Sequence, residues 1–188
     1  MELNKESFAD QIEKALKDRI INLEIEQGEK INVSELEREF GVSRAPVREA
    51  LQSLVKQGLV EVKPRVGYFA VELSTKDIND ISELRKLLEI HALEASMEQI
   101  SRTKIKTLHR KSLSIARGKI REEELREKFD NIDREIHWLM IRQADNRLLS
   151  NFMERIHNLV GLTRHLNERI EKANEEHIVL LEEMLAND

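Results

Sequence analysis

The chain has 188 residues, of which 40% are hydrophobic and 36% are charged, and 31 Lys and Arg stand against 36 Asp and Glu for a net charge of -5. This length suits one ordinary domain or two small ones, and the hydrophobic content excludes a disordered chain. The absence of Cys excludes disulfides and thiolate chemistry. No apolar run is long enough to span a membrane and the first residues lack the pattern of a signal peptide, so we expect a cytoplasmic protein.

The first forty residues contain two predicted helices. Apolar residues at spacings of three and four predict an amphipathic helix over residues 7–23. Ser34 and Glu37 have the spacing of a capping box, so a short helix over residues 34–40 is expected. Gly41 follows this helix, at a place where a tight turn needs a positive φ.

A third helix is predicted between Ser43, its expected N-cap, and Gly58, a natural C-terminal stop. The apolar face of this helix has helical spacing and consists of Val47, Ala50, Leu51, Leu54 and Val55. Arg44, Arg48 and Gln52 recur every four residues, and they therefore occupy the opposite face.

The one clear β pattern comes next. Residues 59–63 and 68–71 are rich in β-branched and aromatic side chains, and the turn between them contains Arg65 and Gly67. Short helix, glycine turn, second helix and hairpin is the order of a winged helix-turn-helix unit, in which the hairpin is the wing.

This unit has residues suited to binding DNA. From the third helix to the wing tip, five basic residues stand against two acidic ones, a local charge of +3 in an acidic chain. The guanidinium groups of Arg44 and Arg48 can each take O6 and N7 of guanine, although two arginines on one helix face can also be a solvated surface. Ser43 can hold a phosphate oxygen, and Arg65 and Gly67 can approach the DNA backbone or the minor groove.

The second half of the chain is predicted to be helical throughout. Apolar periodicity predicts helices over residues 75–99, 103–116, 121–144, 147–170 and 174–185. We therefore expect a mainly α protein of two domains. The first is a winged helix-turn-helix over residues 1–73, and the second is an antiparallel all-helical bundle over residues 74–188.

A candidate metal site lies in this second half. Asp133 and His137 are four residues apart, so they share one face of a helix and can chelate a divalent metal. His177 precedes an apolar stripe on a later helix and can face the interior of the bundle. Taken alone, an Asp and a His one turn apart are more often a surface pair than metal ligands.

The string GVSRAPVREAL over residues 41–51, followed by Gly58-Leu59-Val60 and a wing that ends at Gly67, resembles the GntR superfamily of bacterial transcription regulators. The resemblance implies a homodimer that binds a short inverted repeat in double-stranded DNA. It also implies that Arg44 and Arg48 read bases and that Gly67 lies on the wing.

Residues 74–188 are similar to the all-helical FCD ligand-binding domain of FadR-type GntR regulators. The resemblance rests on ELRKLLE over residues 83–89, DREIH over 133–137, ADN over 144–146 and EH over 176–177. It implies that Asp133, His137 and His177 ligate a divalent metal such as zinc or nickel. A fourth His of the family pattern has no counterpart before Asp188, so we expect a domain without its last helix.

Arg85 completes the candidate sites. The resemblance implies that it pairs with an anionic effector, and an ion pair with Glu89 one turn on is the alternative. His157 and His165 are left open, because imidazoles that line a pocket also suit an anionic ligand.

These features predict a DNA-binding transcription regulator whose operator affinity is changed by a small organic acid held in the helical domain. The alternatives are a regulator for which the metal itself is the signal, a metal that only stiffens the fold, and a metal-dependent hydrolase or lyase. We expect no enzyme, because the sequence contains neither a nucleophile elbow nor a phosphate-binding loop.

Overall fold

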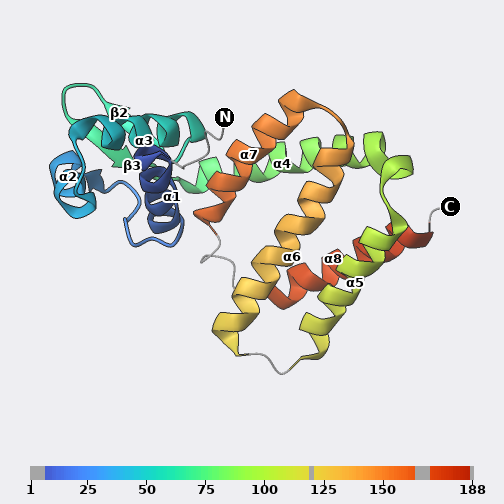
Figure 1. Cartoon of the computed structure of the whole chain (residues 1–188). Helices are drawn as coiled ribbons and strands as arrows, with labels where there is room; N and C mark the ends of the chain where they lie inside the picture. Colours follow the sequence, from blue (N-terminus) through green and yellow to red (C-terminus); the bar gives the residue numbers. More distant parts are fainter. Residues whose placement is uncertain (1–6, 119–120, 164–169, 187–188) are drawn as a thin grey trace, which may run out of the picture. The chain divides into compact units, whose positions relative to one another are not determined.

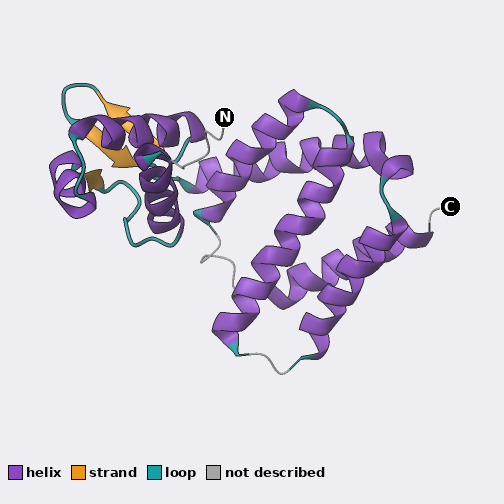
Figure 2. Ribbon diagram, in the orientation of Figure 1, coloured by secondary structure: helices purple, strands orange, loops and turns teal. Residues whose placement is uncertain are grey.

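The computed structural model describes residues 7–118, 121–163 and 170–186 (Figure 1). The predicted mainly α fold is confirmed: the described residues form eight α-helices and one three-stranded antiparallel sheet (Figure 2). They divide into two compact units. The first comprises the described residues of Met1–Ser82 and Glu154–Arg164, and the second those of Glu83–Met153 and His165–Asp188.

Three helices build the first unit: α1 (Phe8–Ile21), α2 (Val33–Phe40) and α3 (Arg44–Gln57). The N-cap of α1 is Ser7, whose hydroxyl accepts from the Asp10 backbone N–H in a capping box. Each helix turns an apolar face inward, as its spacing predicts. Side chains at most 2% exposed at the centre of this core include Ile12, Leu16, Ile20, Val47, Ala50, Leu51, Leu54 and Leu59.

The sheet has the strand order β1-β3-β2, with β1 at Lys30–Ile31, β2 at Val60–Lys63 and β3 at Gly67–Ala70. Tyr68 of β3 lies opposite Val62 on one side and Ile31 on the other. The hairpin of β2 and β3 is the predicted wing. The sequence did not predict β1, because two residues are too few to show a period of two.

The start of α2 corrects one prediction. The N-cap is Asn32, whose Oδ1 accepts from the Ser34 backbone N–H at 3.1 Å and whose Nδ2 donates to Glu35 Oε1 at 2.8 Å. The capping box predicted for Ser34 and Glu37 is therefore wrong, because Ser34 is already inside the helix. Asn is as good an N-cap as Ser, and it stands directly after β1.

Two glycines end helices as predicted. Gly41 after α2 and Gly58 after α3 have φ angles of 65° and 80°, in the left-handed region that favours glycine. A Cβ at Gly58 would also lie only 3.0 Å from Arg155 Nε. Ser43 is the N-cap of α3 by backbone conformation, but its hydroxyl makes no capping hydrogen bond.

A segment distant in sequence completes the first unit. Helix α7 (Arg147–Gly161) belongs to the second unit up to Met153, and from Glu154 onward to the first. Leu162, just after α7, is fully buried in the core of the winged helix, and its carbonyl oxygen accepts from Gln27 Nε2 at 3.3 Å. The compact unit that carries the wing thus depends on residues from both halves of the chain.

The remaining helices form the bundle of the second unit. They are α4 (Thr75–Ser96), which belongs to this unit from Glu83 onward, α5 (Arg102–Arg117), α6 (Glu122–Gln143) and α8 (Ile170–Ala186), and a short 3-10 helix, Met97–Gln99, follows α4. Helices α5 and α8 pack along each other, as Figure 1 shows. The buried side chains of α6 are spaced by three and four residues, which is the expected pattern for a helix in a bundle.

One predicted helix is wrong. Residues 147–170 were expected to be a single helix, but α7 ends at Gly161, and Ile170 is the first residue of α8. Residues 164–169 lie outside the described residues. The apolar pattern continues through this region, so periodicity alone did not mark the break.

No helix among the described residues is both long and apolar enough to cross a membrane.

Candidate nucleic-acid interface and metal centre

The exposed face of α3 carries the residues predicted to read bases. Arg44, Arg48 and Gln52 are exposed, while Val47 and Leu51 between them are fully buried. Gln52 Nε2 donates to the Tyr68 hydroxyl at 2.9 Å, which joins this face of the helix to strand β3. The outward face of α3 is therefore held in register with the wing.

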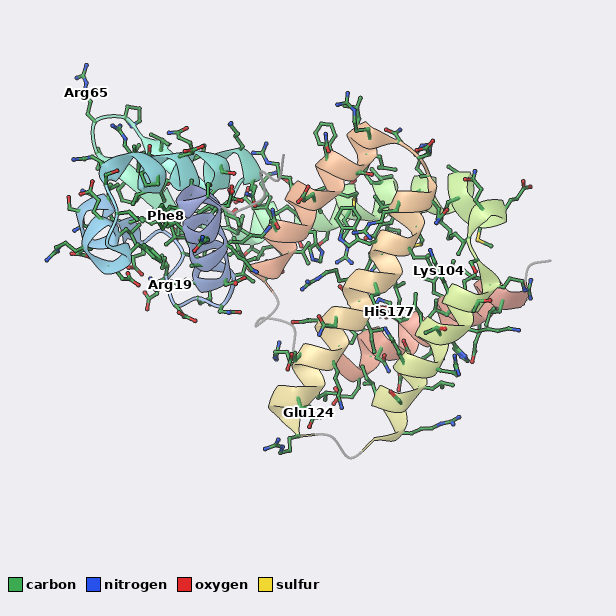
Figure 3. All side chains as sticks on the ribbon, in the orientation of Figure 1. Phe8, Arg19, Arg65, Lys104, Glu124 and His177 are labelled. Carbon is green, nitrogen blue, oxygen red and sulfur yellow. The ribbon has the colours of Figure 1, made fainter. Side chains whose placement is uncertain are left out.

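Helix α3, the start of α2 and the wing together line one concave surface of about 630 Å³. Its basic residues come from β1, α3 and the wing: Lys30, Arg44, Arg48, Lys63 and Arg65. We call this surface the basic concavity. Figure 3 shows Arg65 at the wing tip, pointing away from the fold.

All three arginines of this surface are available to a ligand. Lys63 pairs with Glu61 at 3.0 Å, whereas Arg44, Arg48 and Arg65 form no ion pair with any residue that the structure describes. Arginines without acidic partners on one concave surface suit the phosphates and guanine edges of DNA.

Gly67 follows the turn of the wing, where it pairs with Lys63. Its φ of 138° is one that other residues rarely adopt, and a Cβ there would lie 3.5 Å from Lys30 Cε. Ser43 is exposed at the N-terminus of α3, where backbone N–H groups have no partners within the helix. A phosphate oxygen can accept from such groups.

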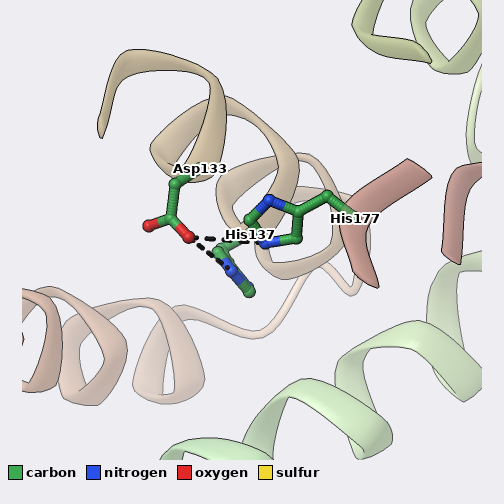
Figure 4. A group of neighbouring side chains, drawn as sticks. All are labelled: Asp133, His137 and His177. Carbon is green, nitrogen blue, oxygen red and sulfur yellow. Dashed lines mark hydrogen bonds and ion pairs between the residues drawn. The ribbon is translucent and has the colours of Figure 1, made fainter. Parts of the chain in front are cut away.

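The candidate metal ligands meet inside the bundle, as Figure 4 shows. Asp133 and His137 lie on α6 and His177 on α8. Asp133 Oδ1 is 3.2 Å from His137 Nε2 and 3.4 Å from His177 Nε2. One ligand atom from each residue lies within 4.8 Å of the others. The surface-pair alternative for Asp133 and His137 does not hold, because both side chains are less than one-fifth exposed.

Helix α4 adds a second layer of charge. Glu89 Oε1 lies 2.8 Å from His137 Nδ1, outside the direction of a ring N–H hydrogen bond, and 2.6 Å from Arg85 Nε. Arg85 also approaches Asp133 Oδ1 at 3.8 Å. Glu89 thus faces the ring nitrogen of His137 that points away from Asp133, as carboxylates behind metal-bound histidines commonly do.

Burial and charge set the protonation of this cluster. Burial disfavours the Asp133 carboxylate, but the hydrogen bond from His137 and the charges of His137, Arg85 and His177 outweigh burial, so the pKa of Asp133 is well below its usual range. Burial lowers the pKa of His177 and keeps that imidazole neutral. Burial also opposes the charge on His137, but its carboxylate partners raise the pKa overall.

These residues fit a divalent metal. One ionised carboxylate and two imidazoles form a donor set suited to zinc, nickel and related ions. The His177 ring stacks on Phe129 with centroids 5.6 Å apart, which fixes its plane. A metal bound at Nε2 of His137 would compete with a proton for that nitrogen, so metal binding would depend on pH.

Comparisons with known proteins agree with this arrangement. The family model described as bacterial regulatory proteins, gntR family, matches residues 8–70, and the FCD domain model matches residues 80–188. The chain is 31% identical over 173 residues to an HTH-type transcriptional regulator of Bacillus subtilis, YdhC, which covers 90% of this chain and 77% of the relative. The chain belongs to the GntR family.

Other relatives extend the likeness. This GntR-family chain is 25% identical to RspR of Escherichia coli, an HTH-type transcriptional repressor, over 84% of the chain and 68% of the relative. The solved structure of E. coli McbR/YncC matches with a TM-score of 0.73 at 21% identity, covering 97% of this chain and 88% of that one. The latter shows a shared fold, and the family as a whole is one of DNA-binding transcription regulators.

Most of the predicted site residues in this GntR-family regulator come together in the two clusters. Arg44, Arg48, Arg65 and Gly67 line the basic concavity, with Ser43 beside it at the N-terminus of α3. Asp133, His137 and His177 form the metal cluster. That these residues bind DNA and a metal stays a prediction.

The structure also informs the open alternatives. Arg85 makes the predicted ion pair with Glu89, and it also lies beside the metal cluster. Sequence reasoning missed the contact of Glu89 with His137, and the spacing of four between Arg85 and Glu89 predicts only the ion pair of those two residues. His157 is half-buried on α7 in the first unit, and His165 lies outside the described residues.

Proposed function

We propose that this regulator binds an inverted-repeat operator as a homodimer in the cytoplasm, and that a small carboxylate held by a divalent metal in the FCD domain changes its operator affinity. The observation that carries the DNA-binding part is the basic concavity, where three arginines without acidic partners come from the recognition helix and the wing.

Each arginine has a distinct task in this proposal. Arg44 and Arg48, one turn apart near the N-terminus of α3, enter the major groove and read guanines. Arg65 at the wing tip contacts the backbone or the minor groove, and Ser43 holds a phosphate. The net charge of -5 keeps nonspecific attraction to DNA weak, so operator binding depends on these local charges and falls with added salt.

Dimerisation follows from the geometry of an inverted repeat, because two recognition helices must reach grooves about 34 Å apart. The second unit has apolar side chains that suit such an interface. Leu84, Leu87 and Ile90 on α4 and Leu148 and Phe152 on α7 are all 46% or more exposed. Large exposed apolar side chains at helical spacing are typical of surfaces that a partner covers, and a second copy is the partner that the operator requires.

The effector part of the proposal rests on the metal cluster. When bound, a divalent metal would act as a Lewis acid that accepts carboxylate oxygens. Asp133, His137 and His177 would hold it, and Glu89 would keep the His137 ring in place. Arg85, which already lies between two carboxylates, would pair with the anionic effector.

Helix α7 offers a route by which effector binding in the FCD domain influences the DNA-binding unit. Its residues from Glu154 onward contact the end of the recognition helix, where Asn158 Nδ2 donates to Gln57 Oε1 at 3.4 Å. Helix α7 is continuous, and its residues belong to the second unit at its start and to the first unit at its end. A shift of its first turns would therefore also displace the residues that contact the last turn of α3. Such coupling requires that the effector bind with different affinities to the two conformations of the protein, the one with high and the one with low operator affinity.

Replacing Arg48 with Ala tests the DNA-binding part. We expect operator affinity to fall by about 1–3 kcal/mol, with relaxed discrimination at one base pair, because a bidentate contact to guanine is lost. The operator would first be selected from a random duplex pool with the wild-type protein. Binding of operator and random duplexes would then be followed by fluorescence anisotropy at fixed salt.

The matched control for this experiment is Arg38→Ala, which removes an equal charge from an exposed arginine of α2 that does not line the basic concavity. It should leave operator affinity nearly unchanged. Equal losses on operator and random DNA for Arg48→Ala would mean that Arg48 holds phosphate, and no loss at all would remove it from the interface.

Replacing Leu87 with Glu tests the dimer. Leu87 is 60% exposed, so the change should leave the fold of the chain intact but bury a charge in the proposed interface. We expect the dissociation constant of the dimer to rise at least about tenfold, since an uncompensated buried charge costs more than 1.4 kcal/mol. Sedimentation equilibrium measures it, with Val179→Glu on α8 as the control, and an unchanged dimer would place the interface elsewhere.

A further inference from the structure

A second cavity, of about 430 Å³, lies between α5 and α6, and none of the candidate metal ligands lines it. We call it the α5–α6 groove. Its volume is in the range of small-molecule pockets. Leu108, Trp138 and Leu139 give it apolar walls, and the two leucines and the indole are at least half-buried.

The rim of this groove is cationic. Lys104 from α5 and Arg134 and Arg142 from α6 line it, and none of the three forms an ion pair within the described part of the chain. The acidic lining residue, Glu135, is already paired with Lys111, whose Nζ is 2.6 Å from Oε2. The groove therefore combines an apolar interior with three uncompensated positive charges.

Trp138 adds a preference for flat groups. The Arg142 guanidinium carbon lies 5.3 Å from the centroid of the indole ring, a cation-π arrangement that leaves a planar guanidinium beside a planar ring. The aromatic ring of a ligand can stack on the guanidinium as well as on the indole. A ligand that satisfies the whole groove thus has an aromatic body and an anionic end.

We propose that the α5–α6 groove is a second ligand site of this protein, and that it takes a small aromatic carboxylate. The ring lies against Trp138 and the leucines, and the carboxylate is held by Arg134 and Lys104. A neutral apolar ligand would leave the cations unused, and an aliphatic acid as small as acetate would leave the apolar walls exposed.

This site is separate from the metal cluster although the two share helix α6. Trp138 directly follows His137, and successive helical residues point about 100° apart, so one side chain lines the groove while the other faces His177. Trp138 is also the only tryptophan of the chain, so all tryptophan emission comes from a residue that lines this groove.

The experiment follows Trp138 emission while 4-fluorobenzoate is added to the full chain at constant ionic strength, with ¹⁹F line broadening as a second readout. Chelator-treated Asp133→Ala protein is used, so that no metal can hold the carboxylate. We expect a saturable change, with 4-fluorobenzamide and acetate binding at least about tenfold more weakly, because one lacks the charge and the other the ring.

Variants locate the binding. Arg134→Gln should weaken 4-fluorobenzoate at least about fivefold through a lost charge-assisted hydrogen bond, whereas Arg117→Gln, an exposed arginine of α5 outside the groove, should not. The proposal is overturned if emission does not saturate, if the benzamide binds equally well, or if the two variants behave alike. It is also overturned if emission changes with protein concentration instead of ligand, which would mean that a second copy covers the groove.

Discussion

Replacing Leu162 with Ala should destabilise the DNA-binding unit by about 2–5 kcal/mol, although this residue lies nearly a hundred positions after the wing in the sequence. Leu162 is fully buried in the winged-helix core, alongside Leu16, Ile20 and Leu54. Removing its branched end leaves a cavity that the helices around it cannot fill, because each is also held by its own contacts.

Hydrogen exchange is the measurement to make, because it follows each unit separately. Amides of α1 and α3 should exchange more than about tenfold faster in Leu162→Ala, since 1.4 kcal/mol corresponds to a factor of ten. Amides of α5 and α8 should change much less. Val179→Ala deletes methyl groups from a side chain that is 58% exposed on α8, and it should be nearly neutral.

The outcome also bears on the route of regulation. Faster exchange in α3 would mean that the end of α7 supports the recognition helix, as the Asn158 to Gln57 hydrogen bond suggests. Unchanged exchange in α1 and α3 would contradict the inclusion of residues 154–163 in the DNA-binding unit, and a signal carried by α7 would then have no physical basis.

The parts of the fold that the sequence predicts well are those fixed by local chemistry. Gly41 and Gly58 mark helix ends because a left-handed residue there favours glycine wherever the rest of the chain lies. Helix α3 is predicted because its buried and exposed faces follow one period over fourteen residues. The wing follows because both strands belong to one short hairpin.

The parts that the sequence does not predict depend on contacts between distant segments. Strand β1 exists because Ile31 pairs with Tyr68, and its two residues carry no pattern of their own. The apolar pattern predicts Leu162 only as a buried position of a long helix, and the packed structure is needed to place it in the winged-helix core.

The metal cluster and the α5–α6 groove show the same difference between local and long-range contacts. Asp133 and His137 are predictable as a pair because helical spacing places them on one face, and His177 joins them through the likeness to the FCD domain. The contact of Glu89 with His137 is not predictable, because it depends on how α4 packs against α6. The α5–α6 groove likewise needs two helices, and neither helix alone shows a pocket.

Replacing Asp133 with Ala should abolish metal binding by the chain. The wild-type protein, purified without chelator, is expected to contain about one divalent metal per chain by elemental analysis. The variant should lose more than about a hundredfold in metal affinity, because removing a ligand costs more than removing its outer support. Asp80→Ala on α4 is the matched control, since that carboxylate makes a surface ion pair with Lys76 outside the cluster.

Metal content and DNA binding together separate the alternatives for the second unit. If operator affinity responds to organic acids only when metal is present, the metal holds the effector as proposed. If it responds to metal alone, the ion is the signal, and if it responds to neither, the metal only stiffens the bundle. Wild-type protein without metal would make Asp133, His137 and His177 the polar lining of a pocket, and Arg85 would then be the first residue to test for binding of an anion.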